Sequence, residues 1–158
     1  MATTAPDRDR PNVVALPPLI YLGFLVLGLL ADLIWPTRIA SLSVRLAVGG
    51  LLFAAGLVLA AWALARFARA GTAVEVYRPA TALVSEGPYR FSRNPIYLGM
   101  TLGYAGLAVM GNSLWALALL IPTLAVIRYG VIAREEEYLE RKFGEAYRRY
   151  RSVVRRWL

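Results

Sequence analysis

A run of 34 residues without a charged side chain, Asn94 to Ile127, most strongly limits how this chain can fold. A single straight helix of that length would extend about 51 Å, whereas the hydrocarbon core of a bilayer is about 30 Å thick. The run must therefore turn back on itself, and Gly111-Asn112-Ser113 supplies a turn signal within it. We expect a hairpin of two transmembrane helices, residues 95–110 and 114–133.

Two further apolar segments precede this hairpin. Residues 16–35 form the first, and residues 46–65 form a second that contains no charged side chain. With 58% hydrophobic residues and a mean hydropathy of +0.52, the chain is more apolar than a typical soluble domain. We therefore predict one all-α integral membrane domain with four transmembrane helices. The polar residues 1–12 are predicted to be a flexible tail.

The net charge of +8 comes almost wholly from arginine. Nucleic-acid binding is one interpretation of a basic chain, but these arginines flank apolar segments, so we expect no nucleic-acid partner. Five lie in the linker 66–93 and seven, with one lysine, follow Ala133, whereas only Arg38 and Arg45 lie on the other side. The positive-inside rule then predicts that both termini and the linker are cytoplasmic. Richness in Ala, Arg and Gly, with a single lysine, indicates a bacterium and hence its inner membrane.

The chain contains no cysteine and no histidine. Disulfides and thiolate chemistry are thereby excluded, and so are the usual general base near neutral pH and the commonest metal ligand. Five of the ten acidic residues lie between Glu135 and Glu145, and no carboxylate cluster elsewhere has the pattern of a metal site. We expect no metal.

The linker before the hairpin contains Pro79 and Gly87-Pro88, which oppose a long helix. We expect an ordered extended loop with a turn at Gly87-Pro88. Asn94 is predicted to be the N-cap of the next helix, with Pro95 at its first position. A helix start offers unpaired backbone N–H groups and a positive dipole end, which suit the carboxylate of a ligand.

Residues 134–150 are predicted to form an amphipathic cytoplasmic helix. Glu135, Leu139, Phe143 and Tyr147 recur every four residues, so this stripe should face something apolar. A carboxylate that faces inward at a membrane interface is a candidate functional group. The alternative, a solvated interfacial helix with a Glu137–Arg141 pair, stays open.

Taken in order, these motifs resemble the isoprenylcysteine carboxyl methyltransferase and phospholipid methyltransferase superfamily, whose members are integral-membrane enzymes that use S-adenosylmethionine. The resemblance covers residues 72–157, and it rests on Leu83-Val84, Gly87-Pro88-Tyr89-Arg90, Arg93-Asn94-Pro95-Ile96-Tyr97-Leu98-Gly99, Glu135-Glu136, Leu139, Phe143-Gly144, Tyr147 and Tyr150. It implies S-adenosylmethionine as the cofactor. The positions implied to contact it are Thr81, Ala82, Leu83, Val84, Tyr89, Arg93, Asn94, Pro95, Ile96, Tyr97, Glu135 and Glu136.

The substrate side of the resemblance is less direct, and no catalytic residue is assigned. Isoprenylcysteine enzymes usually have histidine where this chain has Asn94, and asparagine there is similar to the phosphatidylethanolamine N-methyltransferase pattern. An arginine that contacts substrate in the isoprenylcysteine enzymes falls here at Val131. Arg128 and Arg134 lie one turn away on either side, and either one can take its place as a substrate-binding residue.

The resemblance implies methyl transfer from S-adenosylmethionine to a lipid-like or membrane-partitioned acceptor at the cytoplasmic face. The linker and the Glu135 region would form the cofactor pocket, Phe143, Tyr147 and Tyr150 would close it from below, and the acceptor would enter from the bilayer. Two alternatives stay open. One is methylation of a small soluble thiol or amine, and the other is a non-catalytic membrane protein whose arginine-rich tail binds anionic lipid.

Overall fold

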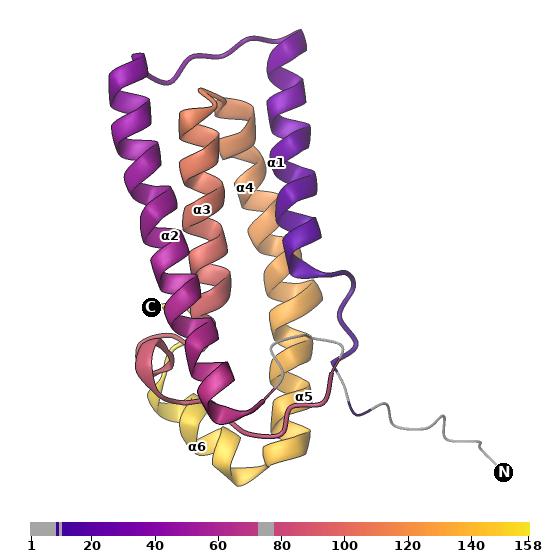
Figure 1. Ribbon diagram of the computed structural model, residues 1–158. Coiled ribbons are helices and arrows are strands. Elements are labelled where there is room, and N and C mark those ends of the chain that lie inside the picture. The colour runs from indigo at the N-terminus through magenta and orange to yellow at the C-terminus, as the bar shows by residue number, and fades with distance from the viewer. Residues whose placement is uncertain (1–8, 10, 73–77) are drawn as a thin grey trace, which may run out of the picture.

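A computed structural model describes residue 9, residues 11–72 and residues 78–158 of the chain. This part is helical and contains no strand, which confirms the all-α prediction for the described residues. Most of the predicted tail 1–12, namely residues 1–8 and 10, lies outside them. Long helices run side by side (Figure 1): α1 Pro17–Ile34, α2 Leu42–Ala70, α3 Pro95–Met110, and a continuous helix made of α4 Leu114–Val126, the π-helical η2 Ile127–Ile132 and α5 Ala133–Phe143.

Three of these helices are long and apolar enough to cross a bilayer: α1, α2 and the continuous helix Leu114–Phe143. The predicted fourth span, α3, has 16 residues and so extends only about 24 Å. Helix α2 packs chiefly against α3, and α1 packs chiefly against α4. Large apolar side chains such as Leu51 (73% exposed) and Ile121 (75%) point outward, as lipid-facing side chains do.

Glycines let α2 and α3 approach closely. A Cβ atom added at Gly56 would lie 2.5 Å from the carbonyl oxygen of Gly99, and one added at Gly106 would lie 2.6 Å from the carbonyl oxygen of Gly49. No real Cβ atom tolerates such distances. The two helix backbones are therefore in direct contact, as in other small-residue membrane interfaces.

The turn predicted at Gly111-Asn112-Ser113 joins α3 to α4. Ser113 caps α4, because its Oγ accepts a hydrogen bond from the Ala116 N–H at 2.9 Å. The Asn112 Oδ1 accepts from the Ile39 N–H at 2.8 Å and so attaches the α1–α2 loop to the turn. One end of the bundle is thereby closed by short connections.

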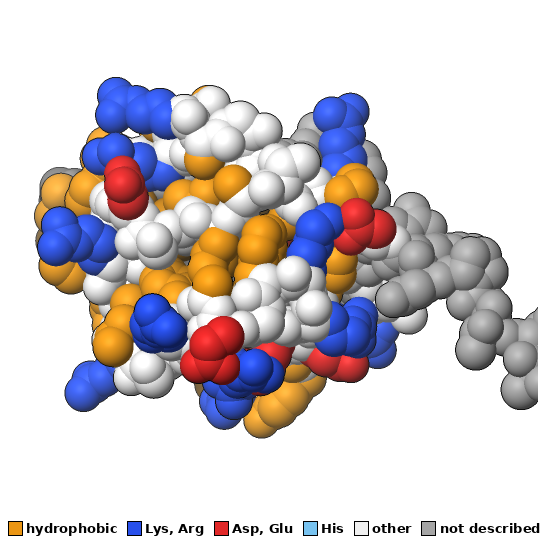
Figure 2. Space-filling view, turned by 90° about the horizontal axis from the view of Figure 1, so that it is seen from below, with side chains coloured by type: hydrophobic (Ala, Val, Ile, Leu, Met, Phe, Trp, Pro, Cys, Tyr) orange, Lys and Arg blue, Asp and Glu red, His pale blue; other side chains and the backbone are white. Residues whose placement is uncertain are grey.

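The opposite end carries the longer connections. Residues 11–16, the linker with its 3₁₀ turn η1 (Gly87–Arg90), and α6 (Glu145–Val153) gather there (Figure 1). The turn expected at Gly87-Pro88 is present, and Gly87 adopts the left-handed φ of 62°. Seen from this end, apolar side chains are visible in the middle, with Lys and Arg side chains around them (Figure 2).

Candidate functional site

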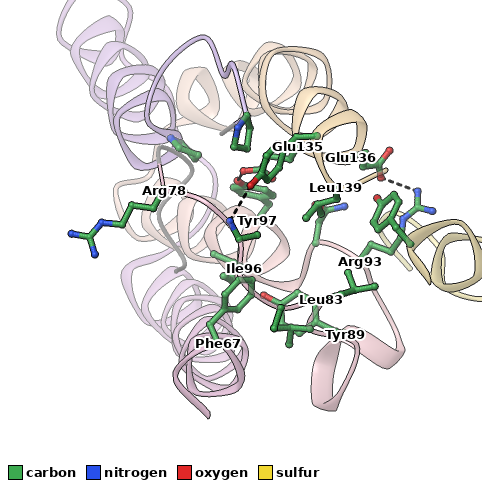
Figure 3. Close-up of a pocket in the computed structure, with 18 of the residues that line it drawn as sticks. Phe67, Arg78, Leu83, Tyr89, Arg93, Ile96, Tyr97, Glu135, Glu136 and Leu139 are labelled. Carbon is green, nitrogen blue, oxygen red and sulfur yellow. Dashed lines mark hydrogen bonds and ion pairs between the residues drawn. The ribbon is translucent and has the colours of Figure 1, made fainter. Parts of the chain in front are cut away.

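A cavity of about 440 Å³ lies at this end of the bundle. Its walls come from residues before α1, the start of α1, the linker, the start of α3, α5 and α6 (Figure 3). Ten of the twelve residues predicted to contact the cofactor line it: Ala82, Leu83, Val84, Tyr89, Arg93, Asn94, Ile96, Tyr97, Glu135 and Glu136. Motifs separated by about forty residues in sequence are therefore brought around one space.

Glu135 lines this cavity from the first turn of α5. The Tyr97 hydroxyl, at the start of α3, donates a hydrogen bond of 2.6 Å to the Glu135 Oε1 (Figure 3). Among the described residues, no arginine or lysine forms an ion pair with Glu135. This carboxylate therefore faces an apolar cavity with a phenol as its partner, an arrangement that favours a ligand that brings donors or positive charge.

Glu136, the next residue, lies in a different environment. It is 7% exposed and accepts hydrogen bonds from two guanidinium groups, those of Arg93 at 2.8 Å and Arg156 at 2.6 and 3.1 Å. The hydrogen bonds to Glu136 raise the pKa of the Arg156 guanidinium. The charge of Glu136 is thus balanced within the protein, and we define Arg93, Glu136 and Arg156 as the ion cluster.

The π-helical segment η2 precedes both glutamates. A π-turn holds about one residue more than an α-turn, so it rotates the helix that follows it, and such segments occur frequently at functional sites. Helix α5 then presents Glu135 and Leu139 to the cavity. The sequence stripe predicted that Glu135 faces inward, but nothing in the sequence indicated the π-helix.

Asn94 occupies the N-cap position of α3 and Pro95 the first helical position, as predicted. The Asn94 side chain, however, makes no capping bond. Its Nδ2 donates instead to the Arg156 carbonyl oxygen at 3.0 Å, and the Arg93 N–H donates to the Arg155 carbonyl oxygen at 2.9 Å. Asn94 is thus the N-cap by position, but its side chain fixes the C-terminal segment against the start of α3 instead of capping the helix.

Aromatic side chains form the wall next to the ion cluster. Tyr147 and Tyr150 are buried on α6, and the Tyr150 hydroxyl donates to the Tyr89 carbonyl oxygen at 2.8 Å. Burial raises the pKa of Tyr147 to about 12 and the pKa of Tyr89 and of Tyr150 well above 10. These phenols stay neutral near pH 7, so they offer apolar faces and hydroxyl groups but no negative charge.

Four predicted site residues do not line the cavity. Pro95, the first residue of α3, is buried, and the Thr81 hydroxyl donates to the Gly71 carbonyl oxygen at 3.2 Å. Arg128 is exposed, with its guanidinium 5.3 Å from the centre of the Tyr129 ring.

Arg134 is exposed as well, and its Nη1 donates to the Asn12 carbonyl oxygen at 2.6 Å. The structure thus gives neither candidate substrate arginine, Arg128 nor Arg134, a place in the cavity wall.

Other cavity residues were not predicted from the sequence. Six of them lie far from the motifs in the sequence: Pro11, Leu16, Pro17, Pro18, Leu19 and Phe67. The others, Arg78, Ala80, Met100 and Tyr138, lie beside motif residues. The paired prolines at the start of α1 were a local signal, since proline is favoured in the first turn of a helix and marks where the chain enters the bundle. The remaining residues carry no such signal, because they line the cavity only through tertiary contacts.

Comparison with known families identifies the group. The phospholipid methyltransferase family matches residues 44–146, about two thirds of the chain, and the chain belongs to this family. The match contains the linker, the start of α3 and both glutamates, which are the parts that meet at the cavity. The chain is therefore an integral-membrane protein of a methyltransferase family.

Three individual proteins are similar to shorter parts of the chain. An uncharacterized protein of Haemophilus influenzae is 55% identical over 49 residues, which is 31% of this chain and 76% of that protein. The nickel-cobalt-cadmium resistance protein NccN of Alcaligenes xylosoxydans xylosoxydans and the cobalt-zinc-cadmium resistance protein CzcN of Cupriavidus metallidurans are each 37% identical over 68 residues. That is 43% of this chain but only 32% of each of the two resistance proteins. No solved structure matches the chain.

Proposed function

We propose that this protein is an S-adenosylmethionine-dependent methyltransferase that acts on a lipid-like or membrane-partitioned acceptor at the cytoplasmic face of a bacterial inner membrane. The observation that carries the proposal is the cavity itself. It gathers the family's separate motifs around a carboxylate, Glu135, whose described partner is the Tyr97 hydroxyl.

The chemistry of the cavity fits S-adenosylmethionine. A volume of about 440 Å³ is within the range of about 300–1,000 Å³ found for sites that hold molecules of this size. Phe67, Leu83, Ile96 and Leu139 supply apolar surface for the adenine ring. Glu135 supplies an acceptor for ribose hydroxyls or for the amino group, and its negative charge suits a ligand that carries a sulfonium.

The start of α3 suits the carboxylate of the cofactor. The first backbone N–H groups of a helix have no partner within that helix, and the dipole is positive there. Because the Asn94 side chain is bound to the Arg156 carbonyl oxygen, it does not compete for those groups. A ligand carboxylate can therefore be accepted at this helix start.

When bound, the cofactor supplies a methyl group that is already activated as a sulfonium. The chain's own residues then have to position the ligands and exclude water. The ion cluster fixes α5 and the C-terminal segment against the start of α3, and Tyr147 and Tyr150 close one side of the cavity. A chain without histidine or cysteine can therefore position the ligands and exclude water.

The binding experiment is a calorimetric titration of purified protein with S-adenosylhomocysteine, comparing Glu135→Gln with Glu137→Gln. Glu137 is exposed and pairs with Arg141 away from the cavity, so its variant is the control. Loss of a charge-assisted hydrogen bond should weaken binding about 10- to 100-fold in Glu135→Gln and leave the control unchanged. Equal affinities in both variants would remove Glu135 from the site.

The acceptor is tested separately, with a bacterial membrane lipid extract and cofactor that carries a labelled methyl group. We expect label in the lipid fraction. Label found only in water-soluble thiols or amines would favour a soluble acceptor. A folded protein that binds no S-adenosylhomocysteine would favour the non-catalytic alternative, an anionic-lipid-binding membrane protein.

A further inference from the structure

Residues 11–16 cross the cavity end of the molecule and lie against the continuous helix; we name them the N-terminal strap. The Val14 N–H donates to the Gly130 carbonyl oxygen at 3.1 Å, within the π-helical η2. A Cβ atom at Gly130 would lie 2.7 Å from the Val14 Cγ2, so the contact is tight. Arg134 holds the strap further along, through the Asn12 carbonyl oxygen.

Asp9, just before the strap, anchors it at the cavity. Its carboxylate accepts hydrogen bonds from the Lys142 Nζ at 2.7 Å and from the Tyr138 hydroxyl at 2.9 Å. The Tyr138 hydroxyl also accepts from the Ala80 N–H at 3.0 Å. Tyr138 therefore joins the N-terminal region to the linker, and both Tyr138 and Ala80 line the cavity.

The strap and the start of α1 form one apolar wall of the cavity. Pro11 is buried, and it lines the cavity together with Leu16, Pro17 and Leu19. Leu16 and Leu19 are also 43% and 60% exposed, and exposed apolar side chains continue along α1 at Leu22, Val26 and Leu30. This wall is thus continuous with the apolar outer surface of α1, and the strap itself contains no charged residue.

The same wall lies outside the part of the chain that matches the family, which begins at residue 44. The wall is therefore separate from the matched motifs, which supply Glu135 and the start of α3 to the same cavity. We infer that the N-terminal strap and the start of α1 form the acceptor-binding wall, which takes the apolar chain of a membrane-dissolved molecule and is held in place by the contact of Asp9 with Tyr138 and Lys142. The part of this inference that concerns methyl transfer rests on the proposed function, whereas the binding of an apolar chain by this wall does not.

The wall can be tested without any activity, because the chain has no cysteine. A single Pro11→Cys in detergent-solubilised protein should react slowly with a maleimide, and faster by about fivefold when combined with Asp9→Ala. Glu137→Ala, which breaks an exposed pair of the same kind, should not change the rate. Addition of a bacterial membrane lipid extract should slow the reaction of Pro11→Cys.

If Pro11→Cys does not fold, Leu16→Cys, at a position that is 43% exposed, still tests protection by lipid. If Asp9→Ala leaves the reaction rate unchanged, Asp9 does not hold the strap in place. If lipid does not slow the reaction, the wall does not bind an apolar chain.

A second experiment separates acceptor from cofactor. Leu16→Trp should lower methyl transfer to the lipid extract by about tenfold while the affinity for S-adenosylhomocysteine stays the same. Leu22→Trp, an exposed leucine of α1 that does not line the cavity, is the control and should change neither. A parallel fall in S-adenosylhomocysteine affinity would overturn the inference, because the wall would then belong to the cofactor. If the unaltered protein binds no S-adenosylhomocysteine, the proposed function fails. The protection of Pro11→Cys by lipid still tests whether this wall binds an apolar chain.

Discussion

Two adjacent glutamates have opposite surroundings at this site. Glu136 is paired with two guanidinium groups, and Glu135 has a tyrosine hydroxyl and the cavity. A buried carboxylate is costly unless its charge is balanced, so the two side chains can serve different purposes. We interpret Glu136 as the group that holds the ion cluster together and Glu135 as the group left for a ligand.

The ion cluster leads to a prediction about stability. Glu136→Gln leaves the Arg93 side chain, which is 9% exposed, without its counter-charge. Breaking a buried pair from one side costs about 3–5 kcal/mol, whereas an exposed pair contributes about 0–1 kcal/mol. In detergent, Glu136→Gln should therefore lower the free energy of unfolding far more than Glu137→Gln does. Equal losses would show that the ion cluster does not stabilise the fold.

Buried tyrosines predict how the protein responds to alkaline pH. Burial raises the pKa of Tyr147 from 10.0 to about 12, and the pKa of Tyr89 and of Tyr150 also rises. Because the folded-state pKa exceeds the unfolded one, their stabilisation is complete below pH 10 and is lost as the pH rises toward 12.

Titration of the tyrosine absorbance checks this prediction. Part of the signal should appear only above pH 11, together with unfolding, and Tyr147→Phe should reduce that late part. A single transition near pH 10, with the fold intact, would contradict it.

At the scale of elements, length and charge in the sequence predicted the apolar helices. The predicted helix 134–150 was wrong in one respect: it divides at Gly144, which has a positive φ of 53°, into α5 and α6. The uncharged run 94–127 predicted the α3–α4 hairpin and its turn, because a helix of that length does not fit a bilayer. The function of Asn94 was not predictable, since its partner, the Arg156 carbonyl oxygen, lies 62 residues away. The π-helix was also missed, because its sequence, Ile127–Ile132, continues an ordinary apolar helix.

The close α2–α3 contact predicts how glycine substitutions in α2 change the stability of the protein. In Gly56→Ala, the new methyl group would lie 2.5 Å from the Gly99 carbonyl oxygen, so the backbones must separate. Overpacking of this kind costs about 1–3 kcal/mol. Gly50→Ala, on the same helix with nothing within 4 Å, should be neutral or slightly stabilising, because alanine favours a helix. Thermal unfolding of both variants in detergent measures the difference, and a Gly56→Ala protein as stable as Gly50→Ala would contradict it.

At the scale of the whole molecule, some of the residues that line the cavity could be predicted from the sequence and others could not. Motif residues such as Ile96, Tyr97 and Glu135 were predictable because they lie in short, recognisable stretches. Pro11, Leu19 and Phe67 were not, because residues from distant segments become neighbours only when the chain folds. The N-terminal strap and the C-terminal segment both join this end, so the cavity depends on the chain before and after the family match.

The last prediction concerns the orientation of the molecule in the membrane. The linker, the strap and α6 lie at one end of the bundle, and the α1–α2 connection lies at the other (Figure 1). Ser41 is the last residue of that connection. Arginines are concentrated at the cavity end, so the positive-inside rule predicts that this end is cytoplasmic. Since the chain has no cysteine, Ser41→Cys and Ser152→Cys each give a single labelling site, and both serines are exposed.

In intact bacteria, a membrane-impermeant maleimide should label Ser41→Cys and should leave Ser152→Cys unlabelled until the membrane is opened. Labelling of both positions after permeabilisation is the control for reactivity. The reverse pattern would place the cavity outside the cytoplasm, away from the supply of S-adenosylmethionine, and would therefore contradict the proposed function as well as the orientation. The same measurement tests α3 as a span, because Ser41 and Ser152 lie on opposite sides of the membrane only if α3 crosses it together with α2 and the continuous helix.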